Sequence, residues 1–374
     1  MISKPKTTFG RPIIPSPERI AELYTESISA GWLTNSGPLH NQFEKAISLW
    51  FDSNETFLTS SGTMALMIGL HAGNLEKGAE VITSPLSFAA SAHAIYWSGF
   101  TPVFADICPK TMTLSVDSVA AAITPNTKAI MPVHFLGQAC EVDKLSELAK
   151  RHNLWLLYDA CHAFGTTING NSISNYGDAS AFSLHATKLL HSGEGGALVL
   201  NSSKNGIKIP QIRNFGLSGG KPIKFGINGK LPEASAAVGL AVMDLVDDEI
   251  IARKALRRKY NALLSDLPNL NVVSSQRGVS DNLIYYAIRI PPSKRAACVV
   301  GLAEIGVLAR DYFPLLCGPG TAFPNHAIAS SHNTPVAPIV APEIICLPFH
   351  SGVDDESVVC IANIIKSKLS NTNN

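Results

Sequence analysis

The sequence lacks an excess of charge of either sign. Its 374 residues include 30 Lys and Arg against 29 Asp and Glu, for a formal net charge of +1. A chain without a basic or acidic excess has no general electrostatic attraction for nucleic acid or for an anionic membrane. We therefore expect neither as a partner, and any anionic ligand must be captured locally.

Cysteine pairs and long apolar runs are also missing. The seven cysteines are widely spaced without a C-x-x-C pair, which favours reduced thiols over a disulfide framework or a zinc site, so we expect no metal. No charged-then-apolar leader opens the sequence, and no uninterrupted apolar run is long enough to span a bilayer. These features predict a soluble, cytoplasmic protein. Charged residues make up only 16%, which is typical of chains that bury surface between subunits, although a large core would also explain it.

The first two thirds of the chain alternate between strand and helix patterns. Helical spacing covers 17–30 and 39–51, and from Glu80 to Asp159 short apolar runs alternate with helical segments at 88–97, 115–123 and 142–152. This alternation predicts an α/β fold with right-handed crossovers and a mostly parallel sheet. No G-x-G-x-x-G follows the first strand, which disfavours a dinucleotide-binding fold.

The remaining third changes in composition. A helical segment at 207–215 leads into a Gly- and Lys-rich loop, and 233–264 reads as one long helix. Beyond about residue 265 the pattern predicts short strands and two short helices, as in a small α+β domain. We predict a large domain over 12–245 and a small C-terminal domain over 246–374.

An acid and a lysine stand at the centre of the candidate site. Asp159 follows the apolar run W-L-L-Y, and Lys188 lies between hydroxyl residues and the G-E-G-G turn. Taken singly, such an Asp is commonly a turn or helix cap and such a Lys is commonly solvated. Together, a carboxylate and a lysine suit a cofactor that needs a protonated ring nitrogen and a Schiff base.

A second candidate element is the segment S-S-G-T at 60–63, which precedes a helical run. Free backbone amides at a helix N-terminus bind phosphate well, although capping by Ser or Thr is the commoner role of such a tetrapeptide. With Phe88 to stack on a ring, these pieces fit a flat, phosphorylated pyridine cofactor. Asp159 would keep the ring nitrogen protonated, and Lys188 would form the imine and then move a proton.

Seven segments, spread from about residue 12 to the C-terminal L-P-F-H, carry a resemblance to a known family. They are S-S-G-T-M-A-L, V-I-T-S-P-L-S-F-A-A-S, T-P-V-F-A-D-I, T-K-A-I-M-P-V-H-F-L-G-Q, Y-D-A-C-H-A-F-G, S-L-H-A-T-K-L-L-H-S-G-E-G-G and R-N-F-G. In this order they resemble the DegT/DnrJ/StrS family of sugar-nucleotide aminotransferases, which use pyridoxal 5'-phosphate (PLP). The resemblance implies the aspartate-aminotransferase fold and a homodimer with active sites at the subunit interface.

The same resemblance implies roles for individual residues. Lys188 corresponds to the Schiff-base lysine, Asp159 to the partner of the ring nitrogen, and His162 to the neighbour of the phenolic oxygen. Phe88 corresponds to the stacking aromatic, and the phosphate is implied to bind Gly62, Thr63 and Ser183.

The family's partner-subunit asparagine corresponds to Asn228. The family pattern G-Y-N-x-R reads G-I-N-G-K here, so Lys230 replaces an arginine, which puts the arginine's sugar or phosphate contact in doubt. Candidate substrate contacts are Trp32, Thr34, His185, Lys230 and Tyr312. His134, His185 and Glu194 could each line the site or support it from behind.

The expected activity is transfer of an amino group from L-glutamate to a 4-keto-6-deoxy sugar linked to a nucleotide, dTDP by resemblance. The product would serve a surface polysaccharide, such as lipopolysaccharide, or another glycosylated product. Three alternatives remain open: a 3-keto sugar as acceptor, a PLP-dependent sugar dehydratase, and a noncatalytic binding protein on the same fold. The known dehydratases have histidine in place of the lysine, so Lys188 disfavours the second.

Overall fold

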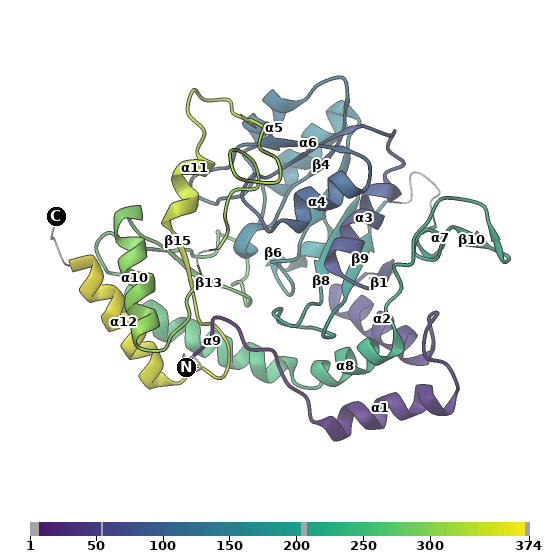
Figure 1. Ribbon diagram of the computed structural model, residues 1–374, viewed down its shortest axis with the longest axis horizontal. Coiled ribbons are helices and arrows are strands. Elements are labelled where there is room, and N and C mark those ends of the chain that lie inside the picture. The colour runs from purple at the N-terminus through teal and green to yellow at the C-terminus, as the bar shows by residue number, and fades with distance from the viewer. Residues whose placement is uncertain (1–6, 54, 203–207, 311, 371–374) are drawn as a thin grey trace.

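An eight-stranded sheet forms the centre of the computed structural model, which describes residues 7–53, 55–202, 208–310 and 312–370 (Figure 1). The strand order is β1-β9-β8-β5-β4-β2-β3-β14. β9 runs antiparallel to β1 and β8, while the pairs from β8 to β14 are parallel. The predicted mostly parallel sheet is therefore confirmed. The strands are Thr56–Thr59 (β1), Glu80–Thr83 (β2), Thr101–Ala105 (β3), Thr127–Met131 (β4), Trp155–Asp159 (β5), Ala179–Ser183 (β8), Gly196–Leu200 (β9) and Ile328–Ala329 (β14).

Helices cover both faces of this sheet, which explains why its strands read as continuous apolar runs. On one face Ile68 of α3 (Gly62–Ala72) and Ile95 of α4 (Ala90–Trp97) share a buried cluster with Leu157. On the other face α5 (Val116–Ala122) and α6 (Val142–His152) pack with Leu156. Consecutive residues of β5 thus serve opposite cores.

A buried carboxylate joins three further helices. Glu233 begins α8 (Glu233–Met243), and its carboxylate accepts hydrogen bonds from Ser27 Oγ at 2.7 Å, Leu39 N at 2.8 Å and His40 N at 3.0 Å. These donors belong to α1 (Pro17–Ser29) and to the first turn of α2 (Pro38–Phe51). The free amides at the start of α2 are thereby satisfied by a side chain from a distant helix.

The prediction of one helix over 233–264 is wrong. The chain bends between α8 and α9 (Val246–Leu264), where Leu245 leaves helical geometry with φ −116° and ψ −8°. The first turn of α9 carries Asp247, Asp248 and Glu249, which favour a new helix N-terminus. No Gly or Pro marks the bend, so the apolar periodicity continues across it.

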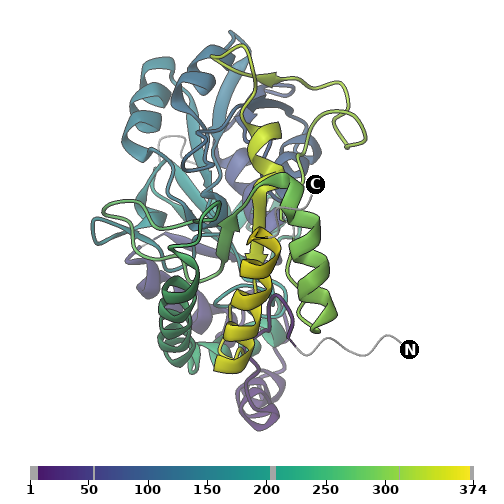
Figure 2. The same cartoon turned by 90° about the vertical axis from the view of Figure 1, so that its left-hand side faces the viewer.

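The C-terminal region forms its own apolar cluster, in which α9, α10 (Pro292–Glu304) and α12 (Asp355–Ser370) pack on a three-stranded sheet (Figure 2). That sheet consists of β12 (Asn271–Val272), β13 (Tyr286–Arg289) and β15 (Ile344–Leu347). α10 and α12 confirm the two helices predicted beyond residue 265. β14 leaves this region and pairs with β3 of the central sheet, and the division at 245/246 stays a prediction.

The predicted helix over 207–215 shortens to α7 (Ile209–Ile212), and Ile207 lies outside the described residues. The following loop contains the hairpin of β10 (Leu217–Ser218) and β11 (Lys221–Pro222), which projects from the body at the right of Figure 1. The small remaining elements are η1 (Phe135–Gly137), β6 (Thr167–Ile168), β7 (Asn171–Ser172), η2 (Ile173–Asn175), α11 (Ala337–Val340) and η3 (Ala341–Glu343). No helix in the described part of the chain combines the length and apolar character needed to cross a membrane.

Candidate active site

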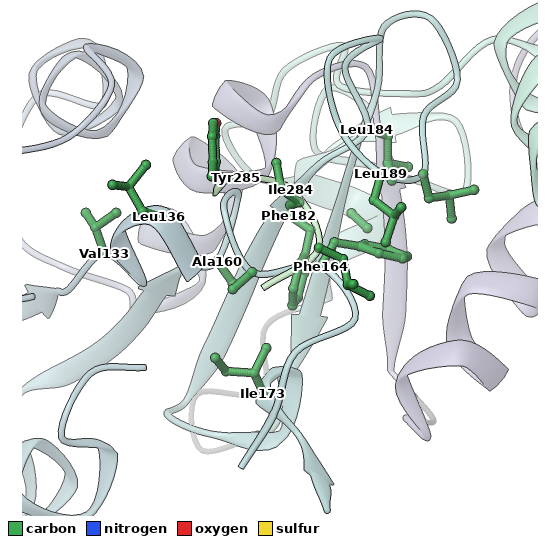
Figure 3. Close-up of a cluster of buried hydrophobic side chains, with 14 of the residues drawn as sticks. Val133, Leu136, Ala160, Phe164, Ile173, Phe182, Leu184, Leu189, Ile284 and Tyr285 are labelled. Carbon is green, nitrogen blue, oxygen red and sulfur yellow. The ribbon is translucent and has the colours of Figure 1, made fainter. Parts of the chain in front are cut away.

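The loops that carry the candidate residues rest on one apolar cluster. Figure 3 shows Phe164 from the turn after β5, Phe182 from β8 and Leu189 from the Lys188 loop packed side by side. The ring of Phe182 also stacks on Phe51 of α2, with centroids 4.3 Å apart. Close packing of these side chains therefore fixes the turn after β5 and the Lys188 loop relative to each other.

Asp159 ends β5 with both carboxylate oxygens engaged. Oδ2 accepts a hydrogen bond of 2.6 Å from Ser91 Oγ of α4, and Oδ1 accepts one of 3.1 Å from Cys161 N. Asp159 is 4% exposed, so its negative charge is held in a nearly dry setting. The bond from Cys161 N gives Asp159 the turn-capping role that a lone Asp commonly plays. The bond from Ser91 holds the carboxylate toward α4, which forms one wall of the cavity.

Lys188 approaches the same cavity from the loop between β8 and β9. Its Nζ donates a hydrogen bond of 3.2 Å to Tyr285 Oη, and the side chain is buried. Burial lowers the pKa of Lys188, while the nearby Cys161 and Asp159 act in the opposite direction. A lysine with a lowered pKa is more readily available as a free amine, the form that acts as nucleophile and base.

The N-terminus of α3 forms another wall. Ser61 caps the helix by accepting a hydrogen bond of 3.1 Å from Met64 N, so the capping reading of this segment is correct. Gly62 and Thr63 nevertheless face the cavity. A Cβ on Gly62 would lie 2.9 Å from Ser183 Cβ, so the helix end can approach β8 this closely only with glycine there.

His162 is buried beside these groups, and its ring stacks on Phe313 with centroids 5.0 Å apart. Burial, aided by the charge of Lys188, lowers the pKa of His162 well below its ordinary value, so the ring is neutral. Its Nδ1 is buried without a hydrogen-bond partner among the described residues. An unsatisfied polar atom beside a cavity is typical of a group that bonds to a ligand.

The cavity has a volume of about 390 Å³. It brings together nine of the predicted residues, namely Gly62, Thr63, Phe88, Asp159, His162, Ser183, His185, Lys188 and Tyr312. Four predicted residues do not line it, namely Trp32, Thr34, Asn228 and Lys230.

Asn228 and Lys230 bond to each other instead of lining this cavity. Lys230 Nζ donates to Asn228 Oδ1 at 2.6 Å and to Asn214 Oδ1 at 2.9 Å, and it lies 5.2 Å from the ring centre of Phe215. Trp32 lies half-exposed in the loop between α1 and α2.

His134, His185 and Glu194, which could line the site or support it, lie in different settings. His134 is fully buried and stacks on Tyr158 with centroids 4.6 Å apart, and its Nδ1 accepts a hydrogen bond from Cys140 N. It supports the sheet and does not line the cavity. His185 and Glu194 do line it, with 3.6 Å between His185 Nε2 and Glu194 Oε1.

Sequence reasoning missed several lining residues. Tyr285 and Phe313 come from the C-terminal part of the chain, and Phe9 comes from the N-terminal arm. Ser91, which bonds Asp159 but does not line the cavity, was also missed. It lies in V-I-T-S-P-L-S-F-A-A-S, a segment whose phenylalanine alone was assigned a role. A signal for Tyr285 existed: it stands in the apolar run that leads into β13, as the first of two adjacent tyrosines.

These features fit PLP. The buried Asp159, the amine of Lys188, the unsatisfied Nδ1 of His162 and the close α3 N-terminus supply the contacts that a protonated ring nitrogen, an aldehyde, a phenolic oxygen and a phosphate require. Within the described residues, no cluster of His, Cys, Asp and Glu has the arrangement of a metal site.

Comparison with known proteins agrees with this arrangement. The pattern of the DegT/DnrJ/EryC1/StrS aminotransferase family matches residues 16–366. The chain is similar to a dTDP-4-amino-4,6-dideoxy-D-glucose transaminase of Escherichia coli, with 32% identity over 95% of this chain and 97% of the relative. It is also similar to a GDP-perosamine synthase of Caulobacter vibrioides, with 29% identity over 96% and 97%. Among solved structures, DesI in the presence of its TDP-sugar product superposes with a TM-score of 0.89 and 32% identity, covering 99% of this chain and 94% of DesI.

Proposed function

The chain belongs to the DegT/DnrJ/EryC1/StrS aminotransferase family, and from this premise we propose that it moves an amino group from L-glutamate to carbon 4 of a dTDP-linked 4-keto-6-deoxy sugar. The observation that carries the proposal is that Asp159, at the end of β5, and Lys188, from the loop between β8 and β9, line one cavity. The E. coli relative is named for a 4-amino-4,6-dideoxyglucose product, which supports carbon 4 and dTDP.

The family is PLP-dependent, and the cavity residues divide the work of holding that cofactor. Asp159 would hold the proton on the ring nitrogen, His162 would bond to the phenolic oxygen, and Phe88 would pack on the ring face. The α3 amides at Gly62 and Thr63 would take the phosphate together with Ser183. When bound, PLP supplies an electron sink for the carbon that gains or loses the amino group. Lys188 Nζ accepts and returns a proton at that carbon.

Residues outside the cavity support a homodimer with shared sites. The projecting segment 215–225, which contains the β10–β11 hairpin, presents Phe225 fully exposed, at 102% of its reference area, and Phe215 and Ile223 more than half-exposed. An apolar row of this kind on a projecting segment suits a subunit contact. Asn228 follows these residues in the sequence, and the family resemblance implies that it serves the partner's cavity.

With these substrates, the enzyme would supply amino sugars for a surface polysaccharide or another glycosylated product. All seven cysteines are free thiols, which suits the cytoplasm, where thiols stay reduced.

The test is incubation of the purified protein with L-glutamate and a panel of nucleotide-linked 3-keto and 4-keto 6-deoxy sugars, read by mass and proton spectra. We expect a product in which an amine replaces the carbonyl oxygen at carbon 4 of the dTDP sugar. An amine at carbon 3 would support the 3-keto alternative, and loss of oxygen without gain of nitrogen would support a dehydratase. No bound PLP and no conversion would favour a noncatalytic protein.

A further inference from the structure

The amine of Lys188 has a buried protein partner to which the proposed reaction assigns no part. Lys188 Nζ donates a hydrogen bond of 3.2 Å to Tyr285 Oη, and it lies 5.6 Å from the centre of the tyrosine ring. Both side chains line the cavity, and both are buried.

The backbone of Tyr285 is held from two sides. Arg257 Nη2 of α9 donates 3.0 Å to Tyr285 O, and Tyr285 N donates 2.6 Å to Asn282 Oδ1. Asn282 Nδ2 in turn donates 2.8 Å to His162 O. One buried asparagine therefore ties the residue that bonds Lys188 to the turn that carries His162.

The ring of Tyr285 is also fixed. It stacks on Phe9 at 6.0 Å with an interplanar angle of 26° and meets His162 edge-on at 5.1 Å. Phe313 lies at its side, 6.3 Å between centroids. With ring and backbone both held, the hydroxyl keeps one position relative to Lys188.

The groups that face Lys188 leave Tyr285 suited to this contact. Asp159, Cys161 and His162, at the end of β5 and in its turn, interact electrostatically with the amine, and Cys346 and Tyr312 interact in the same way with Tyr285. Burial raises the pKa of Tyr285 well above its usual value, so its hydroxyl stays protonated. A neutral hydroxyl can accept from the ammonium form of a lysine and donate to the free amine.

We propose that Tyr285 is a positioning residue, whose hydroxyl holds the Lys188 amine in place for proton transfer at the substrate carbon. The inference rests on the proposed role of Lys188. A hydrogen bond from the charged amine is stronger than one to the free amine, so the hydroxyl also stabilises the ammonium form relative to the free amine.

The test compares wild type with Tyr285→Phe, which keeps the ring and removes the hydroxyl. The first readout is the rate at which the apoenzyme captures PLP covalently as a function of pH, because only the free amine reacts. Loss of the hydroxyl removes a partner of the ammonium form, so the midpoint of this profile moves down by about one pH unit. In the loaded enzyme kcat falls roughly tenfold, while KM for the sugar is unchanged.

Two variants accompany it. Tyr285→Met also lacks the hydroxyl and is expected to show the same downward shift, so the effect does not depend on one replacement. Tyr286→Phe is the matched control, because its hydroxyl bonds Asn261 Oδ1 at 2.9 Å, away from the cavity, and its midpoint stays at the wild-type value. Normal capture with unshifted midpoints in both Tyr285 variants overturns the inference alone. Failure of wild type to capture PLP overturns the proposed function and this inference together.

Discussion

Ser91 on α4 donates a hydrogen bond of 2.6 Å to Asp159 at the end of β5. The bond joins the helix after the Phe88 loop to the strand that carries the acid, so one side chain orients the carboxylate proposed to hold the cofactor's ring nitrogen. Ser87 Oγ lies 2.7 Å from Ser91 Oγ and extends the chain of hydroxyls away from the cavity. The acid is thus held by a short buried network.

Replacing Asp159 with Asn removes the charge and keeps the size. We expect kcat/KM to fall by roughly 10²-fold or more, the scale on which removing a preorganised electrostatic group acts. Ser91→Ala leaves the charge but frees its orientation, and it is expected to cost roughly tenfold, as for a lost hydrogen bond to a charged group. Steady-state kinetics check both. Ser84→Ala, which removes a buried loop serine bonded to Leu86 O, is the control expected to keep full activity.

Gly62→Ala tests the phosphate cradle. The new Cβ would lie 2.9 Å from Ser183 Cβ and 3.3 Å from Cys161 Sγ, so the α3 N-terminus must move away from β8. Strain from overpacking costs about 1–3 kcal/mol, and we expect the Kd for PLP to rise at least tenfold in equilibrium titrations. Gly10→Ala is the matched control, because its Cβ would meet nothing within 4 Å. Equal affinity of both variants for PLP would show that the cradle lies elsewhere.

Asn228 permits a test of shared sites. A mixed dimer of one Lys188→Ala chain and one Asn228→Ala chain retains one intact site of two if Asn228 serves the partner's cavity, so it should show about half of wild-type activity. A mixed dimer of wild type and a chain carrying both substitutions should then be inactive. If Asn228 serves its own chain's cavity, the two results exchange. Differently tagged chains, co-expressed and purified as mixed dimers, provide the samples.

The carboxyl of Glu44 is expected to make part of the free energy of unfolding depend on pH. Burial raises the pKa of this carboxyl, but the His40 ring, with Nε2 3.3 Å from Glu44 Oε2, and the charge of Arg213, with Nη1 2.7 Å from the same oxygen, outweigh it and lower the pKa from 4.5 to about 2. A lowered folded-state pKa contributes stability that is present above pH 4.5 and is lost as the pH falls toward 2.

Glu44→Gln lacks this contribution. Near pH 7 the free energy of unfolding of the variant should be lower than that of wild type by about 3 kcal/mol, less some solvent screening. The difference should shrink below pH 4.5. Urea unfolding at a series of pH values measures it, with the exposed Glu26→Gln as control. A difference that stays constant from pH 7 to pH 3 would contradict the role assigned to this carboxyl.

The sequence predicted the sheet because its strands are buried on both faces and carry apolar runs between helical segments. The positions of Phe88 and Asp159 were predictable for a related reason. Parallel strands bring their carboxyl ends to one edge of the sheet, so the residues at the ends of β2 and β5 were expected at the same edge. The family resemblance is confirmed by the match over residues 16–366. It had assigned roles to Phe88, His162 and Lys188, and the structure brings all three into one cavity.

The rest depended on contacts between distant parts of the chain. Tyr285 and Phe313 reach the cavity because the C-terminal region packs against the large sheet, and local periodicity carries no record of such packing. The bend at Leu245 was missed because apolar spacing fits a continuous helix as well as a bent one. His134 follows β4 at the edge expected for site residues, yet stacking on Tyr158 keeps it in the interior.

The role of Lys188 is tested most directly by reducing the PLP-loaded protein with borohydride and mapping its peptides by mass. We predict one phosphopyridoxyl group, on the peptide that contains Lys188, and we predict that Lys188→Ala neither acquires this mass nor aminates the sugar in the presence of glutamate. A label on another lysine, or transamination by Lys188→Ala at the wild-type rate, would contradict the assignment.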